Sequence, residues 1–593
     1  MRVPSLTSRQ QKYARGPMCS AARMTCGCVI TCLLAAWAHG QGTAVPRALR
    51  LDHTIKGDLS RGQTESFTVH LEAGDYLQCV IDQIAGHTDA TVYGPAGDKV
   101  KFISNDPVSS GRPLVEQAEL ELVDVIALSP GEYRIETRPA GEAPVRYTIT
   151  YSEHKTMAER TRLGPVFRPL HSVKIDALRR ELQGGNASAL AAFWTEIDRT
   201  GSPLIEPIAA DPQHCLVTVL WRDKTGLKNV ALRWESYANS DPEQYAFEHL
   251  AQSDVWYLTL RLPRGARFVY QLSADDDLVP YSRFDIADNN AAVRHDASAM
   301  LDPLNPKKWI QHNGEFSLAE LPGAPPQPWV EKRPGIAEGR IEKRQFKNDR
   351  LGNEREIAIY TPPGYSAHHS PYPLMVLFDE KQYLTMVPTP TILDNLIAAQ
   401  KIPPLVAVLV DAVDRDTRRT ETMGANADAY ADVMSTDLIA WILASYNVTR
   451  DPAQTIAAGS SANGFASMYM AWRHPDVFGN VLCQSGALFW EPGTGPGTGV
   501  PLGEHPEWLA RQVAQSPKKA IRFFVEAGLF EDSREGILDT SRHFRDVALA
   551  RGYEIHYQEF AGGHNYINWR GSLADGLIYL ASPWPSNSKR GKP

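Results

Sequence analysis

The pattern of apolar and polar positions changes several times along the chain. In residues 45–152, short alternating or β-branched runs are separated by turn sequences rich in glycine, proline and aspartate. A charged, helix-like stretch covers residues 153–199, and a second series of alternating, aromatic-rich runs covers residues 200–320. A proline-rich stretch precedes residues 340–585, where nearly continuous apolar runs alternate with helix-like segments. Each change of period marks a change in the predicted structure.

These patterns predict a multidomain protein. Half-buried strands alternate apolar and polar residues, so the blocks at 45–152 and 200–320 predict two N-terminal β-sandwich domains. The stretch at 153–199 predicts a helical connector between them. Apolar strands that alternate with helices form a mostly parallel sheet covered on both faces, so residues 340–585 predict an α/β domain, and an α/β-hydrolase sheet is the natural host for the nucleophile elbow described next.

One short segment of this last block has the pattern of a nucleophile elbow. The sequence GSSANG at residues 459–464 follows an apolar, strand-like run and leads into a helix-like run. In such an elbow, a serine (here Ser461) stands on a strained turn between strand and helix. Gly459 occupies the position of the first expected glycine, but Asn463 occupies that of the second. Asparagine tolerates a left-handed backbone, so we expect the turn either at Asn463 itself or displaced to Gly464.

A serine nucleophile needs a base and an acid, which follow it in that order in α/β-hydrolases. His564 follows two glycines directly after the predicted strand at 554–560, and it is the only one of the 17 histidines in such a position. Glu531 follows the preceding strand and is expected to accept the Nδ1 proton of His564. Asp532 is the alternative acid. The predicted catalytic set is Ser461, His564 and Glu531.

The oxyanion hole is expected to use two backbone N–H groups, which need no particular side chain. The amide of Ala462 directly follows the nucleophile at the start of the predicted helix and is expected to be one of them. The other is expected in the loop after the predicted strand at 374–378, at Lys381 or Glu380. The order of the elements alone does not choose between these two positions.

Several short motifs occur in the order found in a known family. Among them are Gly201-Ser202-Pro203-Leu204-Ile205-Glu206-Pro207, Asp302-Pro303-Leu304-Asn305, Gln484-Ser485-Gly486 and Gly562-Gly563-His564. With these motifs, residues 193–580 resemble the enterochelin esterase family of esterase-D-like hydrolases. The resemblance implies hydrolysis of the trilactone ester bonds of catecholate siderophores, often with iron bound. It also implies that Ser461 and His564 are the nucleophile and the base, and that the second sandwich helps to close the pocket.

The first strand-rich block has a resemblance of its own. Its motifs are G-x-L, F-x-V, L-x-A-G-D-Y, V-Y-G-P-x-G and G-x-Y-x-I, in that order. This series is similar to the bacterial pre-peptidase C-terminal type of domain found on secreted enzymes. The similarity implies a binding or spacing module without catalysis.

Two positions depart from the enterochelin esterase pattern. Asn463 replaces a glycine of the elbow, and residues 379–381 read D-E-K where the family has D-G-E. These changes bear on the substrate more than on the ester chemistry. Ferric catecholates are anionic and aromatic, so arginines and tryptophans near the pocket are expected to bind them. The candidates are Arg418, Trp490, Trp569 and Arg570, with surface charge and core packing as the alternative roles.

Composition and charge exclude some classes of function. The 593 residues are 43% apolar and 22% charged, which is ordinary for a globular protein. A net charge of −8 argues against nucleic acid as a partner. Beyond the first 40 residues, the cysteines are Cys79, Cys215 and Cys483. They have no metal-ligand spacing and predict three buried thiols, so neither a metal nor another cofactor is expected.

The first 40 residues predict a secretory signal. Basic residues precede an apolar stretch at 24–37, and small residues follow it. An uncleaved anchor is the alternative, and Met18 or Met24 is an alternative start. Export implies a periplasmic or secreted protein, and no later run is long enough to span a membrane.

The leading hypothesis is therefore an exported serine esterase that acts on a small-molecule ester, such as a ferric siderophore. Two alternatives remain open. One is a feruloyl or acetyl esterase that acts on polysaccharide, because related hydrolases have this activity and the extra sandwich suits carbohydrate. The other is a non-catalytic binding protein on a hydrolase scaffold, which the altered elbow favours.

Overall fold

The computed structural model describes ten segments of the chain. They are residues 45–103, 120–127, 129–160, 172–234, 245–276, 278, 298–311, 314–494, 507–531 and 536–584. The predicted signal at residues 1–40 and the alternative acid Asp532 lie outside them. Within these segments, no helix has both the length and the apolar character needed to cross a membrane. Cys79, Cys215 and Cys483 are buried free thiols, as predicted.

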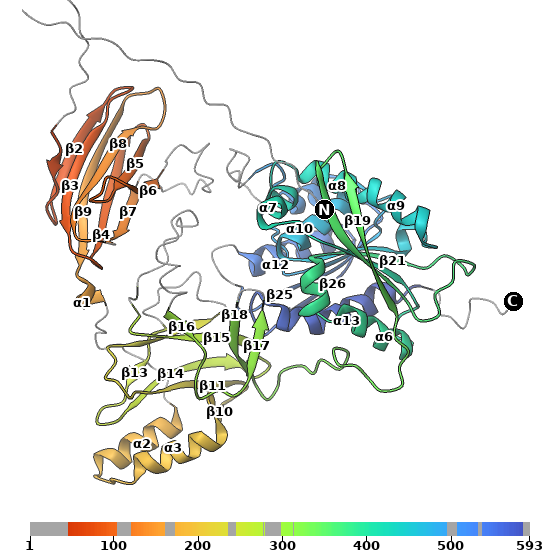
Figure 1. Ribbon diagram of the computed structural model, residues 1–593, viewed down its shortest axis with the longest axis horizontal. Coiled ribbons are helices and arrows are strands. Elements are labelled where there is room, and N and C mark those ends of the chain that lie inside the picture. Colours follow the sequence, from red (N-terminus) through yellow and green to blue (C-terminus); the bar gives the residue numbers. More distant parts are fainter. Residues whose placement is uncertain are drawn as a thin grey trace, which may run out of the picture. The chain divides into compact units, whose positions relative to one another are not determined.

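The first block folds into two sheets that share one apolar core (Figure 1), and their pairings are antiparallel except that of β1 with β3. One sheet has the order β1-β3-β8-β5-β6 and the other β2-β9-β4-β7. Inward positions alternate along the strands, so residues such as Phe67 and Ile149 are fully buried. The elements are β1 (Arg47–Ala48), β2 (Thr54–Leu59), β3 (Glu65–Leu71), β4 (Tyr76–Ala85), β5 (Thr88–Tyr93), β6 (Lys99–Ile103), β7 (Leu120–Ile126), β8 (Gly131–Pro139), β9 (Val145–Lys155) and α1 (Met157–Arg160).

The second block also folds into two antiparallel sheets, with orders β10-β11-β14-β13 and β12-β15-β18-β17, and β16 pairs with β15. The two predicted sandwiches are therefore both present. The strands are β10 (Leu204–Ile208), β11 (Asp211–Arg222), β12 (Val230–Trp234), β13 (Glu248–His249), β14 (Val255–Pro263), β15 (Arg267–Ala274), β16 (Ala299–Met300), β17 (Lys308–Gln311) and β18 (Gly314–Glu320).

Two helices pack on the second sandwich: α2 (Val173–Gln183) and α3 (Ala189–Thr200). Their apolar side chains, among them Ile175 and Trp194, form one buried cluster with Leu220 of β11. These helices lie in the stretch expected to be a connector. Their apolar faces make them part of the second domain instead, because an amphipathic helix buries its apolar side against the nearest core.

The third block is built on one sheet of eight strands, with the order β19-β20-β22-β21-β23-β24-β25-β26. The first two pairings, β19 with β20 and β20 with β22, are antiparallel, and all later pairings are parallel. The predicted mostly parallel sheet is therefore confirmed. The strands are β19 (Arg340–Asn348), β20 (Asn353–Thr361), β21 (Leu374–Phe378), β22 (Val406–Val410), β23 (Thr455–Ser460), β24 (Asn480–Gln484), β25 (Arg522–Gly528) and β26 (Glu554–Phe560).

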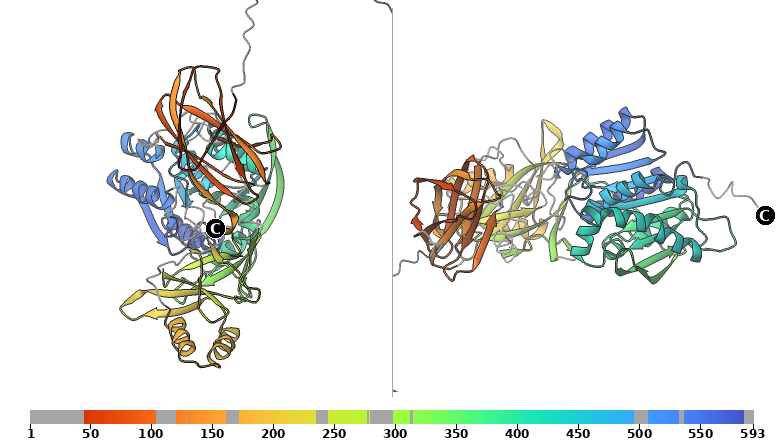
Figure 2. Two further views of the ribbon diagram at one scale, coloured as in Figure 1. Left: turned by 90° about the vertical axis from the view of Figure 1, so that its left-hand side faces the viewer. Right: turned by 90° about the horizontal axis from the view of Figure 1, so that it is seen from above.

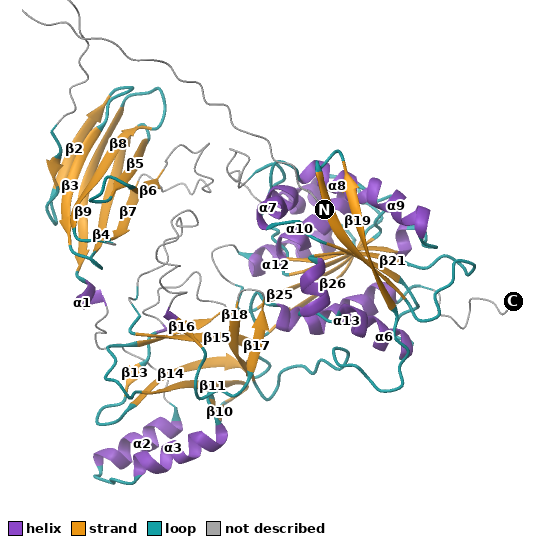
Figure 3. Ribbon diagram, viewed as in Figure 1, coloured by secondary structure: helices purple, strands orange, loops and turns teal. Residues whose placement is uncertain are grey.

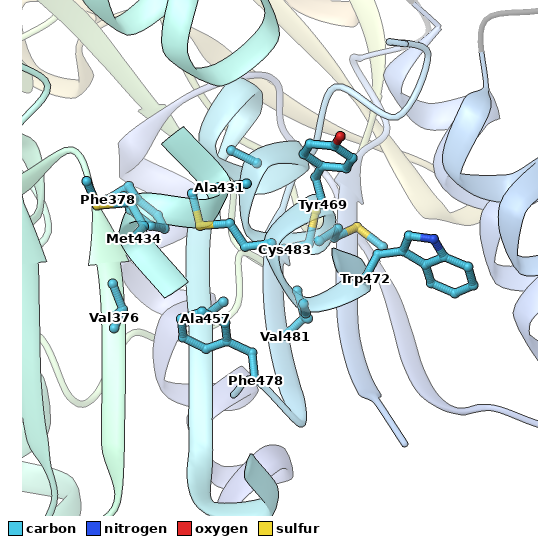
Figure 4. Close-up of a cluster of buried hydrophobic side chains, with 14 of the residues drawn as sticks. Val376, Phe378, Ala431, Met434, Ala457, Tyr469, Trp472, Phe478, Val481 and Cys483 are labelled. Carbon is cyan, nitrogen blue, oxygen red and sulfur yellow. The ribbon is translucent and has the colours of Figure 1, made fainter. Parts of the chain in front are cut away.

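Helices cover both faces of this sheet (Figure 2, Figure 3). One apolar cluster joins the sheet to α8–α12, and a second joins its other face to α5, α6 and α13. In the first cluster, Val376, Ala457 and Val481 come from three adjacent strands and lie beside α10 (Figure 4). The helices are α5 (Glu380–Thr385), α6 (Thr389–Ala398), α7 (Arg415–Met423), α8 (Ala427–Ser435), α9 (Asp437–Ser445), α10 (Ser461–Arg473), α11 (Trp508–Gln515), α12 (Ile537–Ala550) and α13 (Tyr566–Ala581).

Candidate active site

Ser461 lies on the turn between β23 and α10, where its φ is 58°. A left-handed backbone is uncommon for serine and marks a strained turn. Gly459 permits this turn, because a Cβ atom at that position would lie 2.5 Å from the carbonyl oxygen of Asn463. Asn463 itself lies inside α10 and is not among the residues with positive φ. The expected left-handed residue is therefore neither Asn463 nor Gly464 but the serine.

Gly464 serves packing rather than backbone conformation. A Cβ atom there would lie 3.1 Å from Cα of Gly486 and 3.2 Å from Sγ of Cys483. The helix α10 can thus approach the end of β24 closely. The second glycine of the elbow is displaced by one position because the close contact falls at residue 464, one step beyond Asn463.

His564 and Glu531 come together at the carboxyl edge of the sheet. His564 lies in the loop between β26 and α13, and its Nδ1 is 2.7 Å from Oε1 of Glu531. The other carboxylate oxygen, Oε2, accepts the N–H of Gly528 at 2.6 Å. The Glu531 side chain is only 2% exposed, whereas that of His564 is 36% exposed. A buried carboxylate held in this way can fix the ring tautomer and stabilise an imidazolium.

Trp569 supports the imidazole from the side. Its ring meets that of His564 edge-on, with centroids 4.9 Å apart at 88°. The indole Nε1–H donates to Oγ of Ser485 at 2.9 Å, and the side chain is 2% exposed. Trp569 was predicted to bind substrate, and the contacts made by its ring and its N–H are both internal.

The two helices whose first turns carry the predicted oxyanion donors, α5 and α10, follow neighbouring strands. In the parallel pairing of β21 with β23, Leu377 is the partner of Ala458. The helices α5 and α10 therefore begin at the same edge of the sheet. Ala462 lies in the first turn of α10 and Lys381 in the first turn of α5. First-turn amides have no acceptor within their own helix, so both N–H groups can serve an oxyanion at this edge.

Arg418 forms an ion pair next to the start of α5. Its Nε and Nη2 each lie 2.8 Å from one carboxylate oxygen of Asp379. Asp379 has a φ of 63° and directly precedes α5. The bidentate pair thus stabilises Asp379 in its left-handed conformation. Glu421, on the same helix as Arg418, pairs with Arg355 at 2.7 Å.

The two remaining substrate candidates also have internal partners. Trp490 is 8% exposed, and its Nε1–H donates to the carbonyl of Thr494 at 3.1 Å. Arg570 donates from Nε to Oε1 of Gln327 at 2.6 Å and lies 4.8 Å from the centroid of the Trp309 ring. Substrate binding by these residues, as by Arg418 and Trp569, stays a prediction.

The second sandwich contacts both loops of the acid–base pair; the family resemblance implied that this domain helps to close the pocket, but it named none of these contacts. The backbone N–H of Arg267 donates to the carbonyl of Ala561 at 2.9 Å, in the histidine loop. Phe530, directly before the acid, is 8% exposed and packs with Trp234 and Phe268, at centroid distances of 5.1 and 6.2 Å. The only sequence signal was an apolar residue next to Glu531. In the described part of the chain, no group of three or more His, Cys, Asp or Glu residues could hold a metal ion.

Comparisons with known proteins cover the last two domains. Residues 348–580 match the family model described as "Putative esterase", and residues 216–330 match the model described as "Enterochelin esterase, N-terminal". The iron(III) enterobactin esterase of Dickeya dadantii is 28% identical over 418 residues, which are 66% of this chain and 92% of that protein. The iron(III) salmochelin esterase of Escherichia coli is 26% identical, over 69% of this chain and 98% of its own length.

A solved structure has the same arrangement of elements. The ferric enterobactin esterase of Salmonella typhimurium superposes with a TM-score of 0.53 at 25% identity. The match covers 66% of this chain and 99% of that one. Both family models lie beyond residue 215.

Proposed function

The chain belongs to the enterochelin esterase family and is a carboxylic ester hydrolase, and we propose that it cleaves the trilactone esters of ferric catecholate siderophores. The observation that carries the mechanism is the 2.7 Å contact between Nδ1 of His564 and Oε1 of Glu531. A buried acid paired with an exposed imidazole is the arrangement that a base needs to activate a serine hydroxyl.

In the proposed mechanism, Ser461 attacks the ester carbonyl while His564 takes the proton from its hydroxyl. Glu531 stabilises the imidazolium that forms. The N–H groups of Ala462 and of Lys381 donate to the oxyanion of the tetrahedral intermediate. His564 then returns the proton to the leaving alkoxide, and water cleaves the acyl-enzyme by the same steps.

The siderophore substrate is supported by the names of the relatives, which are enterobactin and salmochelin esterases. A second candidate is an ester of a polysaccharide, such as a feruloyl or acetyl group. It is favoured by the additional sandwich of β1–β9, which lies outside the family models. A module of this kind suits attachment to a large substrate.

Two experiments test the proposal. Wild type should hydrolyse p-nitrophenyl acetate, and Ser461→Ala and His564→Ala should lose this activity; equal rates in all three proteins would exclude a serine esterase and leave a binding protein. The substrate class follows from kcat/KM on ferric enterobactin and on feruloylated xylan. A preference for the xylan of tenfold or more would replace the siderophore with a polysaccharide ester as the substrate.

We also propose that the protein is exported to the periplasm or secreted. The support is the order of basic, apolar and small residues in the first 40 positions. Expression of the full chain in a Gram-negative host, followed by fractionation and N-terminal sequencing, tests this. A full-length protein in the cytoplasmic fraction would contradict it.

A further inference from the structure

The Gln484-Ser485-Gly486 motif takes no part in the chemistry above, yet it lies among the groups that do. It begins at the last residue of β24, which is between β23 and β25 in the sheet. In this register Gln484 is the partner of Ser460, directly before the nucleophile, and of Glu526, five residues before the acid. The motif is therefore at the level of the sheet where the catalytic loops begin.

The Gln484 side chain is fully buried and joins three elements. Its Oε1 accepts the hydroxyl of Tyr383, from α5, at 2.7 Å. Its Nε2 lies 3.0 Å from Oε1 of Glu526, on β25, and 2.9 Å from the carbonyl oxygen of Trp569, on α13. One amide thus ties the oxyanion helix α5 to the helix that follows the histidine loop.

Ser485 is also fully buried, and its φ of 47° is left-handed. Its Oγ accepts the indole N–H of Trp569 at 2.9 Å. The Trp569 ring contacts that of His564 edge-on, with centroids 4.9 Å apart. This bond therefore holds in place a ring that packs against the imidazole. A non-glycine residue in left-handed backbone persists only where the surroundings stabilise it, and here the bond to Trp569 does so.

The same segment reaches the nucleophile. The N–H of Ala487 donates to the carbonyl oxygen of Ser461 at 3.1 Å. The N–H of Ser485 donates to the carbonyl oxygen of Glu526 at 2.9 Å. Residues 484–487 therefore bond to the elbow, to the oxyanion helix and to the tryptophan beside the base.

We propose that Gln484 and Ser485 are positioning residues, which hold the oxyanion helix and the imidazole in register with Ser461. The inference rests on the proposed catalytic set. Productive attack needs the reacting groups aligned to a fraction of an ångström. A segment that bonds to the elbow, to α5 and to Trp569 at once sets the separation of these elements, because a shift of either helix breaks a buried hydrogen bond.

The test uses the full chain with Ser485→Ala, Trp569→Phe and the double variant, assayed with p-nitrophenyl acetate. Both single changes remove one partner of the same hydrogen bond. We expect kcat to fall about tenfold with KM within about twofold, as for loss of transition-state alignment. The double variant should fall no further than the worse single variant, because coupled residues are not additive. Ser485→Gly removes the hydroxyl without backbone strain, and it replaces Ser485→Ala in the test if that variant does not fold.

Matched controls separate positioning from stability. Ser541→Ala removes a buried hydroxyl in α12 that has no hydrogen-bond partner within the described structure. Trp584→Phe removes an indole N–H that donates to the carbonyl of Ala453 at 2.7 Å, remote from the loops of the site. Both should keep kcat within about twofold of wild type, whatever their melting temperatures.

Unchanged kcat in variants that only melt earlier would overturn the inference and leave the esterase intact. A wild type that neither hydrolyses p-nitrophenyl acetate nor reacts with a fluorophosphonate probe would instead overturn the proposed function, and the inference with it.

Discussion

Nδ1 of His564 and Oε1 of Glu531 are 2.7 Å apart, and the same carboxylate accepts the N–H of Gly528 through Oε2. The acid is therefore held from both sides, by the backbone of its own loop and by the base. With 2% of its side chain exposed, it has little access to water as an alternative donor. The proposed role of this pair in catalysis can be tested directly by replacement of the acid.

Replacement of the acid should cost activity without unfolding the protein. Glu531→Gln keeps the size of the side chain but no longer stabilises an imidazolium, so kcat/KM for p-nitrophenyl acetate should fall roughly 10²–10⁴-fold. Glu559→Gln is the control, because that carboxylate is exposed on β26 and binds Arg542 at 2.7 Å. A loss below about threefold in Glu531→Gln would show that the base works without this acid.

The elbow should tolerate no side chain at its first glycine. A Cβ atom at Gly459 would lie 2.5 Å from the Asn463 carbonyl oxygen and 2.7 Å from its carbonyl carbon, both of them backbone atoms. Gly459→Ala should therefore displace α10 and lower kcat by at least about tenfold, with a loss of stability of a few kcal/mol.

The control for this change is Gly141→Ala. Nothing lies within 4 Å of a Cβ atom at Gly141, and its φ is not positive. Its activity and melting temperature should match those of wild type. Full activity in Gly459→Ala would mean that the turn at Ser461 does not depend on close approach of the helix.

Much of the third domain was predictable because its strands are buried on both faces. Runs such as β21 and β22 are apolar throughout and end where polar loops begin. The strand β19 escaped prediction because it is an edge strand: of its nine residues, only Phe346 and Asn348 are buried. An edge strand has one pairing partner and faces solvent, so its sequence carries little apolar signal.

The candidate site likewise has a part that the sequence predicts and a part that it does not. Chain order located Ser461, His564 and Glu531, because each follows a recognisable strand in the hydrolase sequence. The contacts that orient them could not be read in this way. The bond between Trp569 and Ser485 spans 84 positions of the chain, and the packing of Phe530 with Trp234 joins two domains. Such contacts depend on how separate elements meet, and no local pattern reports them.

The buried carboxyl of Glu526 should make stability depend on pH. It is fully buried among Ser572, Gln558 and Gln484, at 2.5, 2.9 and 3.0 Å. Burial raises its pKa to about 7, and the charge of Asp575 acts in the same direction. In the unfolded chain the group loses its proton near its ordinary pKa of 4.5.

The direction in which stability changes with pH follows from proton binding. Between about pH 4.5 and about pH 7 the folded protein holds a proton that the unfolded chain has released, so stability falls as pH rises and levels off above about pH 7. The full difference corresponds to about 3 kcal/mol. Urea unfolding at about pH 5 and about pH 8 should show this loss in wild type, and most of it should be absent in Glu526→Gln. The same pH dependence in both proteins would assign it to other groups.

Phe530 should couple the second sandwich to the acid. Its ring packs with Trp234 and Phe268 of that domain, while its neighbour is Glu531. Phe530→Leu should lower the free energy of unfolding by roughly 1 kcal/mol and also lower kcat several-fold, because the loop that carries the acid loses its anchor. Phe544→Leu is the matched control, since Phe544 is also buried, on α12, and meets only Phe523 edge-on among the aromatic rings of the described chain. It should lose similar stability and keep kcat. Equal kcat in the two variants would mean that the sandwich shields the site without orienting Glu531.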